Sequence, residues 1–130
     1  MIKLIPLEDT QALNTLCAAY DIECDKNTHA YISASEDLKA QCIFTLNEYN
    51  VQLLVMDFDD TDPLIAEMLI RAVGAFAANR SGYLFHIRKD VGQAIASTLK
   101  TMGFEELETE YCGKVPVILK GHCCHNDKNN

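Results

Sequence analysis

The side chains best suited to chemistry lie in an acidic connection, Asp57-Phe58-Asp59-Asp60-Thr61-Asp62-Pro63, between an apolar strand and a long apolar helix. Its carboxylates are hard oxygen ligands of the kind that bind Mg²⁺ or Ca²⁺. The spacing matches no calcium loop, because no glycine follows and no glutamate stands at the twelfth position. Carboxylates also stabilise a helix N-terminus by about 0.3–1 kcal/mol each. A solvated helix start, with Asp62 as N-cap, is therefore the preferred interpretation.

A second group of reactive side chains lies near the C-terminus. Thiolate and imidazole are the ligands that zinc prefers, and the candidates are Cys112, His122, Cys123, Cys124 and His125. Cys112 would join them if the last two strands formed a hairpin that turns at Gly113-Lys114. Adjacent Cys123 and Cys124 cannot easily both face one tetrahedral ion, so an exposed, reactive tail is the competing interpretation.

His86 lies in an apolar strand, at the C-terminal end where open α/β sheets place ligands. With Arg88 and Lys89 beside it, His86 could contact an anionic group. The alternative is a half-buried histidine whose ring nitrogens are hydrogen-bonded within the fold.

Length and charge restrict the classes of function. The chain has 130 residues, a net charge of −8 and six cysteines. We expect one domain over residues 1–120 and a polar tail over 121–130. The negative charge argues against nucleic acid and against a membrane surface as partners. With no secretory signal and no span in the apolar stretch Leu64–Ala78, a cytoplasmic protein with free thiols is expected.

Hydrophobic periodicity predicts ten elements. The expected strands are Ile2–Ile5, Ala30–Ser33, Ala40–Leu46, Val51–Phe58, Tyr83–Ile87, Phe104–Tyr111 and Val115–Leu119, and the expected helices are Leu7–Tyr20, Pro63–Asn79 and Val91–Met102. The order is β-α-β-β-β-α-β-α-β-β.

The central strand Val51–Phe58 decides the predicted architecture, because apolar residues occupy both of its faces. The turn-like Asn47-Glu48-Tyr49-Asn50 before it predicts an antiparallel hairpin, whereas Val51 to Ile87 predicts a right-handed parallel crossover. The expected fold is α/β (α+β), with a mixed, mostly antiparallel central sheet and helices on both faces.

Three segments carry a family resemblance: Ile2–Asp9, the Leu46–Val51 hairpin with the long helix that follows, and Lys100-Thr101-Met102-Gly103-Phe104. With the element order, they resemble the GNAT superfamily of acetyl-CoA-dependent N-acetyltransferases over roughly residues 1–120. The resemblance implies an acyl-CoA N-acyltransferase-like fold, acetyl-CoA as cofactor and an amine as substrate.

The chain departs from that family at two places. The family's glycine-containing pyrophosphate loop is missing, since no glycine lies between residues 51 and 73 and carboxylates would repel a phosphate. In addition, Leu99 stands where many members have a tyrosine that protonates the leaving thiolate. The chain is thus expected to be a divergent member.

The resemblance also implies a site. Coenzyme A would be held by main-chain groups of Met56 and Phe58, with Asp62 and Leu64 at the start of the helix, and the oxyanion would be held by a backbone N–H near Phe58. Asp57 would be the general base for the amine.

Three functions stay open from the sequence. One is an acetyl-CoA-dependent N-acetyltransferase of a small amine or a protein amine. Another is a non-catalytic GNAT-like binding or assembly module, and the third is a metal- or redox-responsive protein that uses the Cys/His tail. The outer hairpin expected over Phe104–Leu119 offers a surface for homodimerisation.

Overall fold

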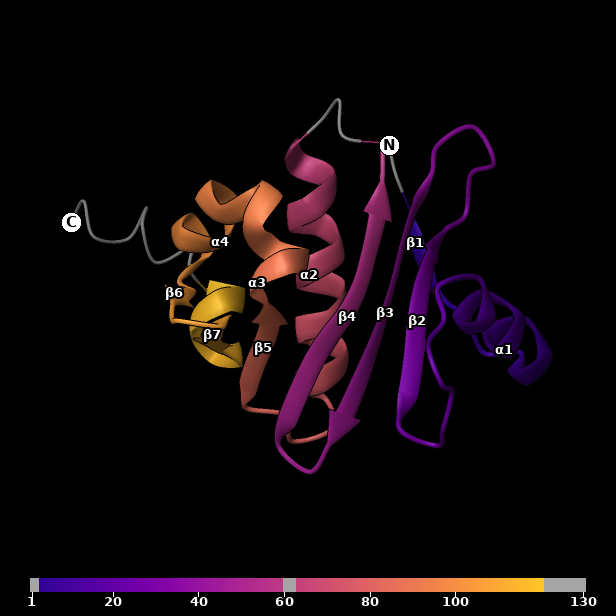
Figure 1. Ribbon diagram of the computed structural model, residues 1–130, viewed down its shortest axis with the longest axis horizontal. Helices are drawn as coiled ribbons and strands as arrows, with labels where there is room; N and C mark the ends of the chain where they lie inside the picture. The colour runs from indigo at the N-terminus through magenta and orange to yellow at the C-terminus, as the bar shows by residue number, and fades with distance from the viewer. Residues whose placement is uncertain (1–2, 60–62, 121–130) are drawn as a thin grey trace.

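The computed structural model describes residues 3–59 and 63–120, which form a seven-stranded sheet with the order β1-β2-β3-β4-β5-β7-β6 (Figure 1). The pair β4–β5 is parallel and every other neighbouring pair is antiparallel. This confirms the predicted mixed, mostly antiparallel sheet. The strands are β1 (Leu4–Pro6), β2 (Thr28–Ser33), β3 (Ala40–Asn47), β4 (Asn50–Phe58), β5 (Leu84–Arg88), β6 (Glu105–Glu106) and β7 (Glu110–Lys114).

Helices cover both faces of the sheet, as the sequence predicts. The helices are α1 (Thr10–Ala19), α2 (Pro63–Ala78), α3 (Lys89–Gly92), the 3₁₀ turn η1 (Gln93–Ile95) and α4 (Ala96–Met102). Successive side chains of a strand point to opposite faces. Phe44 of β3 therefore joins the core under α2, whereas Ile43 joins a smaller core under α1. Figure 1 shows α1 and α2 on opposite sides of β2 and β3.

The core under α2 is the larger of the two. Helix α2 is apolar nearly all round, and its residues Leu69, Ile70 and Val73 are fully buried. Each such side chain contributes about 1.5–3 kcal/mol on burial. The core under α1 has only Cys17, Ala30 and Ile43 as buried members. The α2 side thus dominates the stability of the fold.

A β-bulge shapes the middle strand. Ile43 pairs with Val55 and Phe44 pairs with Leu53, so Leu54 is an extra residue on β4. The β4–β5 pairing runs only as far as Leu53, although β4 continues to Phe58. Beyond the bulge, β4 is therefore paired with β3 alone, and β4 and β5 diverge.

The sequence prediction for the last strand is wrong. Residues 115–120 are helical, and Gly113-Lys114 lies inside β7 instead of forming a turn. Val115 and Ile118 are buried while Val117 is exposed, which is a helical spacing rather than an alternation. Pro116, in the first turn, suits a helix start.

Two further predicted elements differ from the structure. The helix expected over Val91–Met102 is divided into α3, η1 and α4, and the strand expected over Phe104–Tyr111 is divided into β6 and the start of β7. Gly92 lies at the break, where a Cβ atom would come within 2.8 Å of Leu99 and 2.9 Å of Tyr111. A larger residue would not fit there, because buried side chains approach the backbone closely.

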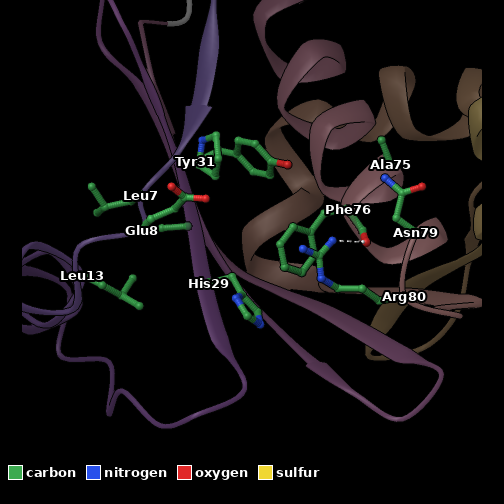
Figure 2. A pocket seen from close by; sticks show the side chains of 11 residues that line it. Leu7, Glu8, Leu13, His29, Tyr31, Ala75, Phe76, Asn79 and Arg80 are labelled. Carbon is green, nitrogen blue, oxygen red and sulfur yellow. Dashed lines mark hydrogen bonds between the residues drawn. The ribbon is translucent and has the colours of Figure 1, made fainter.

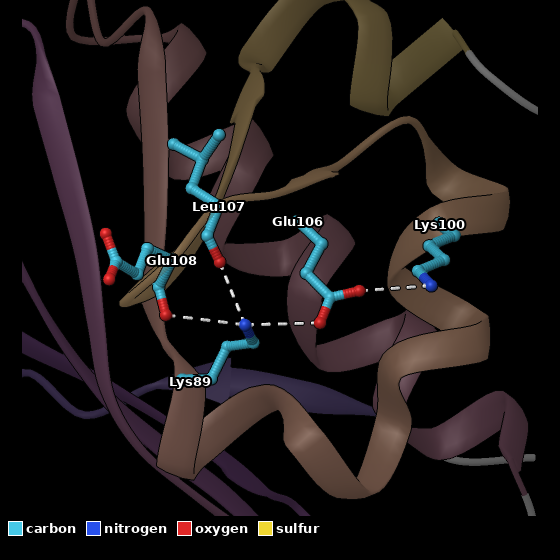
Figure 3. A network of polar contacts seen from close by, with 5 residues as sticks. All are labelled: Lys89, Lys100, Glu106, Leu107 and Glu108. Atoms are coloured by element: carbon cyan, nitrogen blue, oxygen red, sulfur yellow. Dashed lines mark hydrogen bonds and ion pairs between the residues drawn. The ribbon is translucent and has the colours of Figure 1, made fainter.

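Lysine side chains hold the outer hairpin β6–β7 against these helices (Figure 3). Lys89 Nζ lies 3.2 Å from the Glu106 carboxylate and donates a 2.8 Å hydrogen bond to the Leu107 carbonyl. Lys100 Nζ contacts the same carboxylate at 3.1 Å. Lys100, then Lys89, holds the pKa of Glu106 below its usual value.

Within the described residues, no helix is long and apolar enough to cross a membrane.

Candidate functional site

A cavity of about 380 Å³ opens where β4 diverges from β5. One wall comes from the part of β4 beyond the bulge, and the other comes from the α3–η1–α4 segment. The lining residues are Met56, Asp57, Phe58, Val91, Ala94, Ile95, Ser97 and Thr98. Three of the sequence-predicted residues, Met56, Asp57 and Phe58, are thus brought together along one strand.

The main chain of β4 is the principal polar feature of this cavity. On one edge, Met56 and Phe58 lie opposite Cys42 and Ala40 of β3, but the bond from Asp59 N–H to the Lys39 carbonyl shows that the hydrogen-bonded pairs with β3 fall on the odd-numbered residues of β4 beyond the bulge. On the other edge, no described residue of β5 pairs with β4 after Leu53. Peptide groups alternate in direction along a strand, so part of those beyond the bulge point toward the cavity. An extended ligand with amide groups could pair with this edge.

Asp57 lies at the centre of a polar network on the α1 side of the sheet. The Tyr20 hydroxyl donates a 2.5 Å hydrogen bond to Asp57 Oδ2, and Lys39 Nζ lies 3.0 Å from the same oxygen. Gln41 Nε2 in turn donates to the Tyr20 hydroxyl at 2.6 Å. The carboxylate is therefore held in one orientation by Tyr20, directly after α1, and by Lys39, just before β3, while Gln41 of β3 holds the Tyr20 hydroxyl.

These contacts determine the ionisation of both groups. The Tyr20 hydrogen bond, followed by Lys39, holds the pKa of Asp57 below its usual value, while partial burial acts in the opposite direction. Burial, and then the Asp57 carboxylate, raises the pKa of Tyr20. Asp57 is thus an anion at neutral pH and a weak base, better suited to attracting a cation than to removing a proton.

The other predicted site residues have different outcomes. Leu64 lies in the first turn of α2 with 61% of its surface exposed, and it is not among the residues that line the cavity. Asp62 falls outside the described residues, as do His122, Cys123, Cys124 and His125. Leu99 is fully buried in the core, and its hydrocarbon side chain offers no proton donor. Sequence reasoning missed Tyr20 and Gln41, which lie 37 and 16 positions before Asp57 and form no local motif with it.

Cys112 is placed differently from the prediction. It lies within β7, half-buried, and pairs with His86 of β5. His86 Nδ1 lies 3.2 Å from the Glu110 carboxylate, and no basic residue contacts its ring nitrogens among the described residues. Nδ1 thus lies next to an oxygen of Glu110 and Nε2 lies next to an oxygen of Asn50.

A larger cavity, of about 470 Å³, lies between β2 and the end of α2 (Figure 2). The rings of His29 and Tyr31 face Phe76 there, and the Arg80 guanidinium lies 3.7 Å from the centre of the Phe76 ring. Burial, followed by Arg80, lowers the pKa of His29. Arg80 also donates to the Phe76 carbonyl, so the cation already has partners. Of the sequence-predicted site residues that the structure describes, none lines this cavity.

Comparison with solved structures identifies the fold. An acetyltransferase of the GNAT family from Staphylococcus aureus Mu50 matches with a TM-score of 0.65 and 11% identity, over 88% of this chain and 99% of that one. Escherichia coli YhhK, named as a candidate N-acetyltransferase and bound to coenzyme A, matches with a TM-score of 0.64 and 14% identity, over 88% and 98% of the two chains. The predicted acyl-CoA N-acyltransferase-like fold is confirmed.

A third structure, the KacTA–DNA complex, matches with a TM-score of 0.65 and 16% identity, over 98% of this chain and 99% of that one. That protein is in a complex with DNA, whereas the charge of −8 predicts no nucleic-acid partner here. No protein-family model and no curated protein matches the sequence. At these identities, the likeness shows the fold and leaves the activity to be argued from the site.

Proposed function

We propose that this chain is a divergent GNAT-family acyltransferase that binds acetyl-CoA in the cavity beside β4 and acetylates an amine. The observation that carries the proposal is the free edge of β4 from Leu54 to Phe58, which borders that cavity. The same fold in a structure with bound coenzyme A supports it. Apolar side chains such as Val91 and Ile95 would exclude water from the thioester.

The roles of the residues follow from the two sides of β4. Main-chain groups of Met56 and Phe58 would pair with the amides of the cofactor arm, and a backbone N–H near Phe58 would stabilise the oxyanion. The amine would approach from the α1 side, where the Asp57 carboxylate attracts it as an ammonium.

In the reaction, the bound ammonium first loses one proton to solvent. The neutral amine nitrogen then attacks the thioester carbonyl, a C–N bond forms and the C–S bond breaks. The nitrogen loses a second proton to solvent, and the thiolate leaves and is protonated from water. Because Tyr20 and Lys39 keep Asp57 a weak base, we assign it to positioning the amine and not to removing the proton.

The test is the melting temperature of the protein with acetyl-CoA. A ligand at 100 times its Kd stabilises the folded state by about 2.7 kcal/mol, so millimolar acetyl-CoA should raise the melting temperature. Ala94→Trp should abolish this shift, because Ala94 is exposed and lines the cavity. Ala75→Trp is the matched control, since Ala75 is also exposed but lines the larger cavity. No shift in the unmodified protein would end the proposal.

A second candidate function is a binding module that no longer catalyses. It is favoured by Leu99, which cannot protonate the leaving thiolate, and by the acidic connection before α2, which would repel phosphate. Asp57→Asn separates the two functions in an assay against a panel of amines. An acetyltransferase should lose about tenfold or more in activity while its acetyl-CoA shift is retained. A shift without any acetylated product would favour the binding module.

The acidic surface suits a cationic partner, which we infer to be an amine on a small molecule or on a protein. Three further statements stay predictions: a cytoplasmic location, homodimerisation through the outer hairpin, and a single domain over residues 1–120.

A further inference from the structure

A compact group of metal-ligand side chains lies on the α1 side of the sheet, where β5 and β7 meet. His86 and Cys112 are direct cross-strand partners, and Glu110 stands two residues before Cys112 on the same face. A His nitrogen, a Glu oxygen and the Cys sulfur all lie within 4.8 Å of one another. All three residues are half-buried, and rigid strands hold them.

The hydrogen bonds of His86 leave one contact unexplained. Nε2 lies 2.9 Å from Asn50 Oδ1, an acceptor, so Nε2 carries the proton in a neutral ring. Nδ1 then presents a lone pair to Glu110 Oε2, which is only 3.2 Å away and is also an acceptor. Two facing lone pairs repel each other unless a proton or a cation lies between them.

We propose that His86 Nδ1, the Glu110 carboxylate and Cys112 Sγ bind a divalent cation of the zinc class, with water completing the coordination. The nitrogen, oxygen and sulfur set is one that Zn²⁺ accepts, and three protein ligands with water form an open zinc site. Asn50 has the role of the outer partner that fixes the tautomer of a ligating histidine.

The surrounding charge suits a cation. Glu105 of β6 is the cross-strand partner of Cys112, so a second carboxylate lies on this part of the hairpin. A bound dication would be attracted by both carboxylates and would stabilise the thiolate. Cys112 also lines an open cavity of about 220 Å³, which gives an ion a path from solvent. Lys114 is the one positively charged residue in the lining of that cavity, and it would repel a cation.

An imidazolium paired with Glu110 would also relieve the contact, but it would need no thiol. The two arrangements therefore differ in whether Cys112 takes part. They also differ from the sequence hypothesis of a tail site, because Cys123 and Cys124 are not needed here.

The experiment uses the full chain without a histidine tag, stripped with a chelator and titrated with Co²⁺ as the probe, then with Zn²⁺ in competition. We expect one equivalent of Co²⁺ to produce a thiolate-to-cobalt charge-transfer absorption, which Zn²⁺ abolishes. Cys112→Ser should remove that absorption, and Asn50→Ala should weaken the affinity by about 10–100-fold. Cys24→Ser, at another half-buried thiol, and the double variant Cys123→Ser/Cys124→Ser should both bind as the unmodified protein does.

Circular dichroism and the melting temperature of each metal-free variant establish that it is folded. A charge-transfer absorption that persists in folded Cys112→Ser, or one that disappears in Cys123→Ser/Cys124→Ser, would overturn the proposal. An unmodified protein that gives no such absorption with Co²⁺ would overturn it as well and would assign the contact to an imidazolium. Acetyl-CoA binding is independent of all these results.

Discussion

The two faces of the sheet are built differently. The face under α2 carries a continuous apolar core that includes Leu53, Leu69 and Phe85, all fully buried. The face under α1 has three buried apolar residues, a polar network around Asp57 and, beyond the cover of α1, the group around His86. Both candidate sites thus draw their ionisable groups from the face that contributes less to stability.

This difference shows how one strand can serve two purposes. In a closely packed core, almost any change in side-chain volume lowers the free energy of unfolding. Such a core therefore tolerates little variation in its side chains. A face that is only partly covered can hold polar groups near water, provided that each is hydrogen-bonded. In the described residues, no buried side-chain nitrogen or oxygen is left without a partner. The network at Asp57 meets that condition.

The sharpest test of the comparison is a pair of identical truncations, one on each side. Leu69→Ala should lower the free energy of unfolding by about 2–5 kcal/mol, because Leu69 is fully buried in α2 and leaves a cavity. Leu13→Ala in α1 should cost only about 1 kcal/mol, because Leu13 is partly exposed. Urea unfolding measures both, and equal losses would contradict the comparison.

A smaller effect should come from the polar network. Tyr20→Phe removes the hydroxyl that donates to Asp57 and should cost about 1 kcal/mol, less than the roughly 1.5–3 kcal/mol of a buried bond to a charged group, because the Asp57 side chain is 32% exposed. The exposed Tyr49 provides the control, Tyr49→Phe, which should cost much less.

The same variant should change the response to acid. The pKa of Asp57 is lowered in the folded state from 3.8, so its stabilisation is present above pH 3.8 and is lost as the pH falls through the lower folded value. Without the Tyr20 hydroxyl the folded pKa moves back toward 3.8, and the acid loss becomes shallower. Identical acid profiles for Tyr20→Phe and the unmodified protein would show that the network does not control Asp57.

The smallest effect concerns a titratable group on the α2 side. His29 stacks near Phe76, and burial lowers its folded pKa below 6.5. The unfolded state therefore binds more protons just below pH 6.5, so stability should fall as the pH is lowered through that value. His29→Phe should flatten this part of the profile between about pH 8 and pH 5.5. A slope that His29→Phe leaves unchanged would place its origin elsewhere.

Much of the fold was predictable because its signals are local. The hairpin Asn47–Asn50, the parallel crossover and the buried α2 follow from turn composition and periodicity over single segments. The helix at residues 115–120 was missed because a short run, Val-Pro-Val-Ile-Leu, is apolar in either pattern. Tertiary contacts decide it, since Val115 and Ile118 fill the core together.

The candidate site was predictable only along one strand. Met56, Asp57 and Phe58 are neighbours in sequence, so identifying β4 identified that wall of the cavity. Tyr20 and Gln41 join the network around Asp57 from distant segments of the chain. Contacts across such separations produce no recognisable spacing of residues in the sequence. The cross-strand contact of His86 with Cys112 depends on the register of β5 and β7. The sequence prediction placed a turn at Gly113-Lys114, within β7, and so could not predict that register.

The extra residue Leu54 changes which positions of β4 face α2. Before Leu54, the odd-numbered positions Val51 and Leu53 face α2, and after it the even-numbered Met56 and Phe58 do so. Excising Leu54 would only restore a regular alternation from Leu53 to Val55 and leave these faces unchanged, whereas excising Met56 would turn the Asp57 carboxylate inward to the apolar core and Phe58 outward. A single-codon deletion would thus invert the chemistry of the strand end while every remaining amino acid stayed the same.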